Sequence, residues 1–303
     1  MNDSGFAPPG QLWDVGTHKM HLYSLGEGTP TVVLDAGSGD SLLTWQPIQA
    51  EIAQFTRVVA YDRSGMGWSE RGPNPVTPEN VARELHQLLI VADIQLPIIL
   101  VGHSLGGVYV RAFAHWYPDD VIGLILVDSS HESQAARFAE TVPHYLQVSA
   151  NYVTLLKELS GKSHQDILDH FFAGETTDTP IAETEALQRD RLRPTQLATV
   201  AEELDYAYAV GLKQPTDAIP ALGDLRLTVL TATRTIQSPD LSAEEGRTMS
   251  RVFQGLQTEI SQRSTRGQQT FVPDAGHYIH KDQPQVVIDA VRALVEAVRA
   301  ELP

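Results

Sequence analysis

Short β-branched runs alternate with longer segments of helical period over the first 128 residues, and this alternation limits the possible folds more than any other feature. Four runs have the composition of buried strands, at residues 31–35, 57–62, 98–102 and 121–128. Helical spacing fills the intervals between them, at about 45–54, 77–93 and 104–117. Strict alternation predicts a mostly parallel sheet with helices on both faces and with ligand sites at the edge where the strands end.

The alternation stops after Asp128 and resumes near residue 224. Between these points we predict helices and no strand, with the clearest patterns at 145–159, 164–172, 181–193 and 195–210. The pattern then continues as strand, helix, strand and helix, at 226–231, 243–262, 269–272 and 284–300. We therefore expect one α/β core domain, made of residues 1–128 and 224–303, with a helical lid domain at 129–223 on the ligand edge of the sheet.

One predicted strand-to-helix turn carries the motif Gly-x-Ser-x-Gly. The strand at 98–101 runs into Gly102-His103-Ser104-Leu105-Gly106, and a helix begins directly afterwards. The two glycines permit a turn so tight that the serine is strained and its hydroxyl exposed, while His103 should turn away from the active face and pack. A glycine-rich turn with a helix-capping serine is the plainer alternative. Strand, turn and helix together favour Ser104 as a nucleophile.

A serine nucleophile requires a base that accepts its proton. His277 stands in a loop between the last predicted strand and the last predicted helix, which places it at the same sheet edge as Ser104. His277, His280 and Asp282 could be imagined as metal ligands, but no other ligand pattern supports that interpretation. We predict that His277 is the general base.

The histidine in turn requires a carboxylate that orients it and stabilises its protonated form. Asp128 ends the strand that should lie next to the nucleophile strand, from where it can reach the histidine loop. Beyond the strand at 226–231, the first carboxylate is Asp240, which comes late. We choose Asp128 as the acid and keep Asp240 as the alternative, since an aspartate at a strand end can also be a turn residue.

Acyl transfer also requires two backbone N–H groups aimed at the developing oxyanion. Leu105 directly follows the nucleophile and should supply one of them. The loop after the strand at 31–35 contains Gly37-Ser38-Gly39, and we nominate the amide of Ser38 as the second donor. A phosphate-binding role for this loop is disfavoured, because the full spacing of such motifs and a nearby lysine are both missing.

Composition narrows the ligand class. The chain has 22 basic and 38 acidic side chains and a formal net charge of −16, which disfavours nucleic acids and anionic membrane surfaces as partners. It has no cysteine, so thiolate nucleophiles and cysteine-bound metals are excluded. No signal peptide and no apolar run of about 20 residues is present, from which we expect a cytoplasmic protein. A neutral, apolar or cationic small molecule fits best.

Together these motifs resemble the α/β-hydrolase superfamily, and in particular a serine-nucleophile bacterial group of α/β-fold hydrolases. The resemblance to the superfamily rests on residues 31–37 and 61–69, the turn around Ser104, and Gly276-His277, and that to the bacterial group rests on residues 8–10, 13–16, 127–128 and 131–132. It implies the α/β-hydrolase fold and hydrolysis through an acyl-serine, without cofactor or metal, and it implies a structural role for Asp62. An apolar carboxylic ester or lactone is the expected substrate. Aspartate-nucleophile relatives that cleave epoxides are disfavoured, because a serine occupies the turn.

The sequence departs from the family pattern in two places. Ala36-Gly37 stands where the family usually has His-Gly, and the family's acid after its seventh strand is replaced at about Thr235. Relatives that place the acid after the sixth strand support Asp128. The open alternatives are a lyase or cofactor-free oxygenase that uses the same site, and a ligand-binding protein that has kept the fold without turnover. The sequence gives no indication of the oligomeric state.

Overall fold

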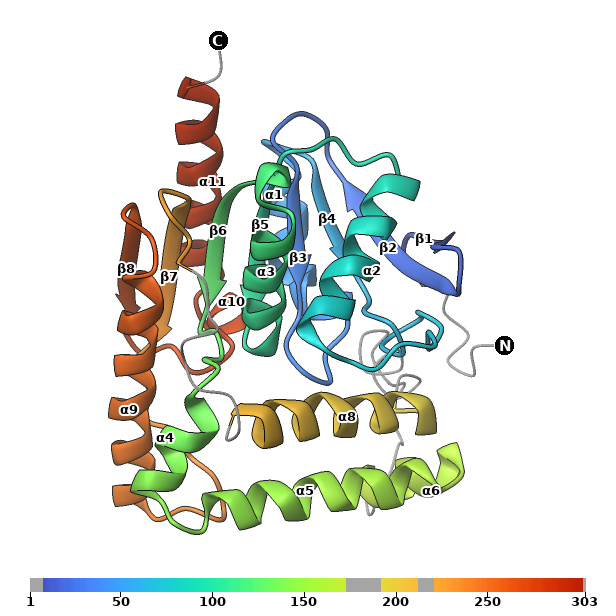
Figure 1. Ribbon diagram of the computed structural model, residues 1–303, viewed down its shortest axis with the longest axis vertical. Coiled ribbons are helices and arrows are strands. Elements are labelled where there is room, and N and C mark those ends of the chain that lie inside the picture. Colours follow the sequence, from blue (N-terminus) through green and yellow to red (C-terminus); the bar gives the residue numbers. More distant parts are fainter. Residues whose placement is uncertain (1–7, 173–191, 212–220, 302–303) are drawn as a thin grey trace, which may run out of the picture.

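The computed structural model describes residues 8–172, 192–211 and 221–301. Within these residues, eight strands form one sheet in the order β1-β2-β4-β3-β5-β6-β7-β8 (Figure 1). The strands from β3 onward pair in parallel, whereas β2 is antiparallel to β1 and to β4. Their bounds are β1 Gln11–Asp14, β2 Lys19–Leu25, β3 Val32–Asp35, β4 Val58–Tyr61, β5 Ile98–His103, β6 Val121–Val127, β7 Arg226–Ala232 and β8 Gly267–Val272.

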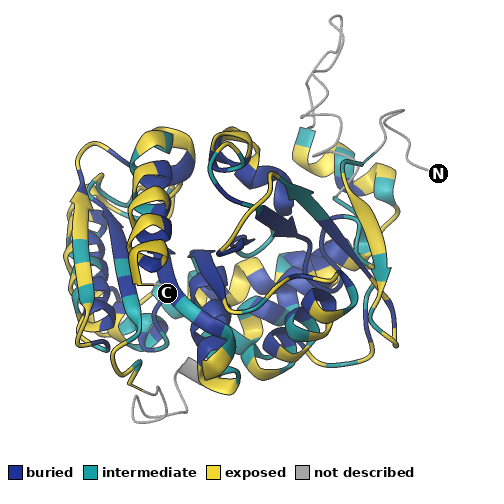
Figure 2. Ribbon diagram, turned by 90° about the horizontal axis from the view of Figure 1, so that it is seen from above, coloured by how far each residue is buried: buried dark blue, intermediate teal, exposed yellow. Residues whose placement is uncertain are grey.

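Helices cover both faces of the sheet, and their buried sides face inward (Figure 2). The residues of α1 and α11 join the apolar cluster on one face, and those of α2 and α3 join the cluster on the other. This arrangement confirms the predicted α/β-hydrolase fold class. The bounds are α1 Gln46–Ile52, α2 Pro78–Val91, α3 Leu105–Trp116, α9 Ala243–Ser261, α10 Ile279–Asp282 and α11 Pro284–Glu301, with short 3-10 helices at Leu42–Trp45 and Pro118–Asp120.

The central strands are apolar on both sides because both sides are covered. In β3, Leu34 belongs to the cluster with α11, whereas Val33 belongs to the cluster with α2 and α3. In β5 the same alternation places Val101 on the first face and Leu100 on the second. All four side chains are fully buried. The core therefore consists of two apolar layers, and it fixes the ends of the strands that carry the candidate site.

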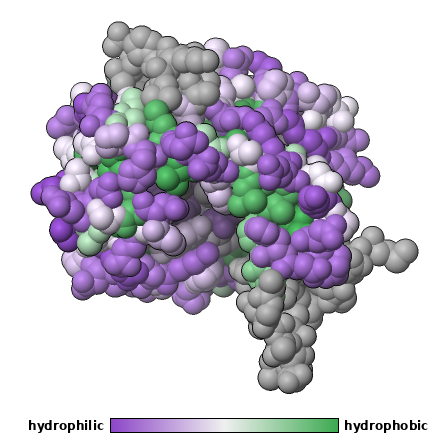
Figure 3. Space-filling view, turned by 90° about the horizontal axis from the view of Figure 1, so that it is seen from below, coloured by the Kyte–Doolittle hydropathy of each residue, from purple (hydrophilic) through white to green (hydrophobic). Residues whose placement is uncertain are grey.

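Further helices separate β6 from β7 and lie across the carboxyl ends of the parallel strands (Figure 1). They are α4 Gln134–Thr141, α5 Tyr145–Ser160, α6 His164–Phe172 and α8 Pro194–Gly211. The helices α5, α6 and α8 pack their apolar residues around Met66, which follows β4. Their outer surface shows apolar patches separated by hydrophilic side chains (Figure 3). Most of the helix expected at 181–193 lies outside the described residues, and the division into core and lid domains stays a prediction.

Two antiparallel strands, β1 and β2, extend the sheet beyond the predicted alternation. In β2, His21 is buried because its Nδ1 lies 2.8 Å from Oδ2 of Asp62 and its Nε2 lies 2.6 Å from the carbonyl oxygen of Pro9. Asp62 also accepts hydrogen bonds from the amides of Leu42 and Trp68. Asp62 thus organises the loop after β4 from within. None of the helices in the described part of the chain is long and apolar enough to cross a bilayer.

Candidate active site

The turn between β5 and α3 holds Ser104 in a strained conformation, with φ 51° and ψ −122°. A methyl group at Gly106 would lie 2.4 Å from the carbonyl oxygen of Ala36, so the turn can pass β3 this closely only with glycine there. Ser104 occupies the N-cap position of α3, but its side chain makes no capping hydrogen bond. Its hydroxyl has no hydrogen-bond partner among the described residues. The hydroxyl therefore stays available for chemistry, which a capping role would not allow.

Asp128 and His277 form a close pair. Nδ1 of His277 lies 2.7 Å from Oδ2 of Asp128, whose side chain is only 4% exposed. The other carboxylate oxygen accepts a hydrogen bond of 2.9 Å from the amide of Ala232, and the amide of Asp128 donates to the carbonyl of Leu230. A carboxylate in this place accepts the Nδ1–H of the imidazole and leaves Nε2 free to accept a proton. The histidine side chain is 46% exposed.

The structure places the alternative acid elsewhere. Asp240 is exposed, in the segment between β7 and α9, and its carbonyl oxygen lies 3.0 Å from Nε2 of His144. No contact joins Asp240 to His277 in the described part of the chain. Of the two aspartates that the sequence left open, Asp128 is therefore the one that the geometry favours.

Ser104 and Asp128 come from neighbouring strand ends. His103, the last residue of β5, pairs with Val127, the last residue of β6. The carbonyl oxygen of Ser104 also accepts a 2.8 Å hydrogen bond from the amide of Ser130, two residues beyond Asp128. The turn around Ser104 and the loop after Asp128 are thus joined directly through the backbone.

His103 connects the turn to the histidine loop. Its side chain is buried as expected, and its Nε2 donates a 2.9 Å hydrogen bond to the carbonyl oxygen of His277. Burial holds the pKa of His103 well below its ordinary value, and the nearby His277 lowers it further, so this ring stays neutral. His103 therefore does more than pack, because it holds the backbone of His277 next to the nucleophile turn. The motif alone does not reveal this bond.

The proposed oxyanion loop touches the nucleophile turn. A methyl group at Gly37 would lie 2.9 Å from Nδ1 of His103 and 3.3 Å from Cβ of Ser104. The Ser38 hydroxyl donates a 2.6 Å hydrogen bond to Glu203 in α8, so the side chain is engaged there. Leu105 is the first residue of α3, and its N–H has no partner inside the helix. The positive end of the helix dipole thus lies beside Ser104, where it favours a developing anion.

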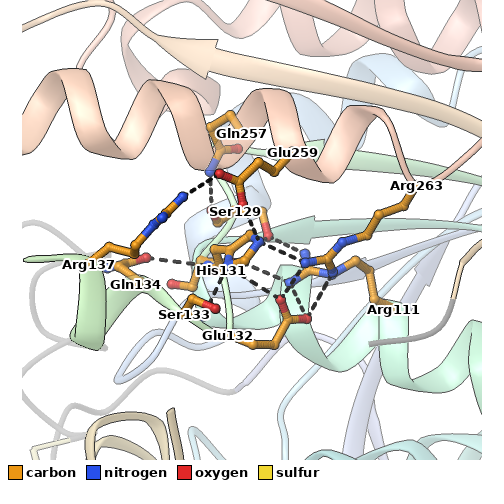
Figure 4. Close-up of polar contacts among 11 residues, drawn as sticks. Arg111, Ser129, His131, Glu132, Ser133, Gln134, Arg137, Gln257, Glu259 and Arg263 are labelled. Carbon is orange, nitrogen blue, oxygen red and sulfur yellow. Dashed lines mark hydrogen bonds and ion pairs between the residues drawn. The ribbon is translucent and has the colours of Figure 1, made fainter. Parts of the chain in front are cut away.

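A cluster of charged side chains around the buried Arg111 fixes the loop after Asp128 (Figure 4). Arg111, from α3, donates to the Ser129 hydroxyl at 2.7 Å and to Oε1 of Glu132 at 2.9 Å, while Arg263 donates to Oε2 of Glu132 at 3.0 Å. Burial alone would raise the pKa of Glu132, but Arg111 and Arg263 together lower it to about 2. Sequence reasoning missed this cluster, since its partners are far apart in the chain. The carboxylate stays ionised, and the acid loop is held in place by fixed charges.

The chain matches known proteins over most of its length. The model of the alpha/beta hydrolase family matches residues 32–290. The chain is 25% identical to the probable transporter efuK of Hormonema carpetanum, over 96% of this chain and 43% of that protein. It is 36% identical to the uncharacterized protein YqjL of Bacillus subtilis, over 34% of this chain and 41% of that protein. The match thus spans less than half the length of each of these two relatives.

Solved structures share the fold. A thermophilic esterase from Thermogutta terrifontis superposes with a TM-score of 0.62 at 23% identity, over 95% of this chain and 99% of that one. The epoxide hydrolase CorEH superposes with a TM-score of 0.66 at 18% identity, over 95% of this chain and 98% of that one. At these identities the likeness shows the fold alone. With the family model matched across both halves of the sheet, the chain belongs to the alpha/beta hydrolase family.

Proposed function

We propose that this protein is a serine hydrolase that cleaves a carboxylic ester or lactone through an acyl-serine intermediate. The observation that carries the proposal is the 2.7 Å contact between the buried Asp128 and the accessible His277, beside a serine whose strained turn leaves its hydroxyl uncapped. A carboxylate that fixes the tautomer of a histidine is the arrangement that activates a serine. The same arrangement needs no metal or cofactor for acyl transfer.

In this mechanism, Nε2 of His277 accepts the Ser104 proton as the oxygen attacks the substrate carbonyl carbon. The amides of Leu105 and Ser38 stabilise the oxyanion of the tetrahedral intermediate. The imidazolium then protonates the leaving alkoxide, and the acyl group stays on Ser104. Water attacks the acyl-enzyme with His277 again as the base, which releases the acid and restores the serine. Asp128 holds the imidazole in one tautomer throughout.

An aromatic row beside His277 supports an apolar substrate. The ring of Phe253 lies 6.5 Å from the ring of His277, and Phe138 lies 6.3 Å from Phe253. The row continues through Tyr145 to Tyr208 on α8, with ring separations of 5.2 and 6.1 Å. These side chains come from core and inserted helices alike, so we assign the helices between β6 and β7 the role of a lid beside His277. Phe138 and Phe253 are buried against each other, so an apolar acyl or alcohol group would bury surface against the partly exposed Tyr145 and Tyr208.

The direct test is intact mass after exposure to a fluorophosphonate, with turnover of a p-nitrophenyl ester recorded in parallel. We expect one phosphonyl adduct on the wild type and none on Ser104→Ala. Ser130→Ala is the matched control, because Ser130 lies beside the same turn, and it should be labelled like the wild type. A wild type that neither reacts nor turns over would favour a ligand-binding protein instead. Products other than the acid and alcohol would favour the lyase or oxygenase alternative.

A further inference from the structure

A buried arginine holds the oxyanion loop, residues 36–39, by its backbone carbonyl groups. Arg63, which follows β4, is 4% exposed. Its Nη1 donates to the carbonyl oxygen of Ala36 at 2.6 Å, and its Nη2 donates to that of Gly37 at 2.8 Å. In a trans peptide the N–H of the next residue points opposite to the carbonyl. With both carbonyls turned toward Arg63, the amides of Gly37 and Ser38 are turned away from it. Arg63 therefore sets the orientation of the amide that we assign to the oxyanion hole.

Arg63 is itself held by two buried carboxylates. Its Nη1 lies 2.7 Å from Oδ1 of Asp35, and its Nε lies 2.9 Å from Oε1 of Glu203. Glu203 is 1% exposed and lies on α8, within the inserted helices. Its second oxygen, Oε2, accepts the 2.6 Å hydrogen bond from the Ser38 hydroxyl. One carboxylate from the inserted region thus contacts both the arginine and the loop that the arginine orients.

A second residue on the same face of α8 contacts the loop again. Gln196 lies seven residues before Glu203, which is two helical turns. Its Nε2 donates a 3.0 Å hydrogen bond to the carbonyl of Gly39, and its Oε1 accepts a 3.2 Å bond from the amide of Gly67. This face of α8 therefore bonds to the oxyanion loop at Ser38 itself and at the next residue, Gly39.

We propose that Glu203 is a positioning residue for the oxyanion hole, which acts through Arg63 and the Ser38 hydroxyl to hold the Ser38 amide toward the reacting carbonyl. The inference rests on the proposed function. It makes α8 a fixed part of the catalytic machinery, although α8 belongs to the inserted helices. The oxyanion donor matters in the transition state more than in the bound substrate, so its misalignment lowers kcat and leaves KM nearly unchanged.

The test compares Glu203→Ala and Glu203→Gln with Glu202→Gln. Glu202 is the neighbouring residue on the same helix, and it also accepts from an arginine, Arg71, and from a backbone amide, that of Val76. Loss of an oxyanion donor costs about 10²- to 10³-fold in kcat, so a misaligned donor in Glu203→Ala should cost roughly 10- to 100-fold. Glu203→Gln keeps an acceptor and should recover part of that loss. Glu202→Gln should stay within about twofold of the wild type.

Ser38→Ala separates catalysis from folding, since it keeps the Ser38 amide and removes only the hydroxyl bond to Glu203. It should fold normally and lose several-fold in kcat at unchanged KM, even if Glu203→Ala fails to fold. Equal kcat in the wild type and in folded Glu203→Ala or Ser38→Ala would overturn the inference, as would a loss confined to KM. A wild type without esterase turnover or fluorophosphonate labelling would instead overturn the proposed function, and this inference with it.

Discussion

Replacement of Asp128 by asparagine is a sharp test of the proposed acid, because the structure dictates how the amide must sit. The amide of Ala232 donates to Oδ1 of Asp128, so the asparagine has to direct its own carbonyl oxygen there. Its NH₂ group then faces Nδ1 of His277, which lies 2.7 Å from the present carboxylate. A donor in that place forces Nδ1 to accept, and the ring proton moves to Nε2.

The consequence is a histidine in the wrong tautomer. An Nε2 that carries a proton cannot accept one from Ser104, so attack on the substrate loses its base. The loss of kcat expected from such a tautomer change is about 10⁴-fold, or roughly 5 kcal/mol in the activation barrier. Because the variant differs by one group of the same size in a buried site, the fold should be preserved. Substrate binding does not involve Nδ1, so KM should change little.

The assay is turnover of a p-nitrophenyl ester near pH 7 by Asp128→Asn, with Asp240→Asn as the matched control. The circular dichroism spectrum and the melting temperature check that each variant is folded. More than a tenth of the wild-type kcat in folded Asp128→Asn would refute the reasoning. If Asp240→Asn loses most of its kcat and Asp128→Asn does not, Asp240 is the acid instead.

Three further predictions concern stability. Burial lowers the pKa of His280 to about 3, so below pH 6.5 the unfolded chain binds a proton that the folded chain does not, and the free energy of unfolding decreases as the pH is lowered. Urea unfolding should show that His280→Phe loses about 2 kcal/mol less stability than the wild type when the pH is lowered from 7 to 5. A methyl group at Gly106 would meet the backbone of β3, whereas one at Gly255 in α9 has open space. Thermal melts should therefore show Gly106→Ala destabilised by about 1–3 kcal/mol, with activity lost, and Gly255→Ala stabilised by up to about 1 kcal/mol; the opposite order would contradict the steric argument. Arg111→Met removes one of the two arginines that hold Glu132, whose side chain is 26% exposed, and should cost about 1–3 kcal/mol in urea, while the exposed Arg137→Gln should cost at most about 1 kcal/mol; similar costs would count against the cluster.

Local patterns were sufficient to predict most of the fold. The buried parallel strands are continuous apolar runs, and the motif around Ser104 marks where one of them meets a helix. The hairpin of β1 and β2 was not predicted, since polar and apolar residues are intermixed in both strands and neither forms a continuous apolar run. His21 is polar and yet buried there, because its partner Asp62 stands 41 residues away. A side chain that is buried through a distant partner leaves no local signal.

The same limit applies to the candidate site. The sequence indicated Ser104, His277 and both possible acids, since each follows a strand or stands in a recognisable motif. Nothing local distinguishes Glu203 from Glu202, although one is buried against Arg63 and the other is half-exposed against Arg71. The difference arises from the angular position of each residue around α8, which only the packed structure defines.

The pairing of β5 with β6 also bears on how the protein would inactivate on warming. Ser104 and Asp128 directly follow paired residues on adjacent strands, so one backbone ladder holds both of them. His277 follows β8, two strands further along the sheet, in a loop with an exposed side chain. Local opening of that loop would separate the base from both partners while the central ladder stays intact. In the proposed mechanism, we therefore expect the catalytic lifetime on warming to depend on this loop at the outer part of the sheet more than on the central strands.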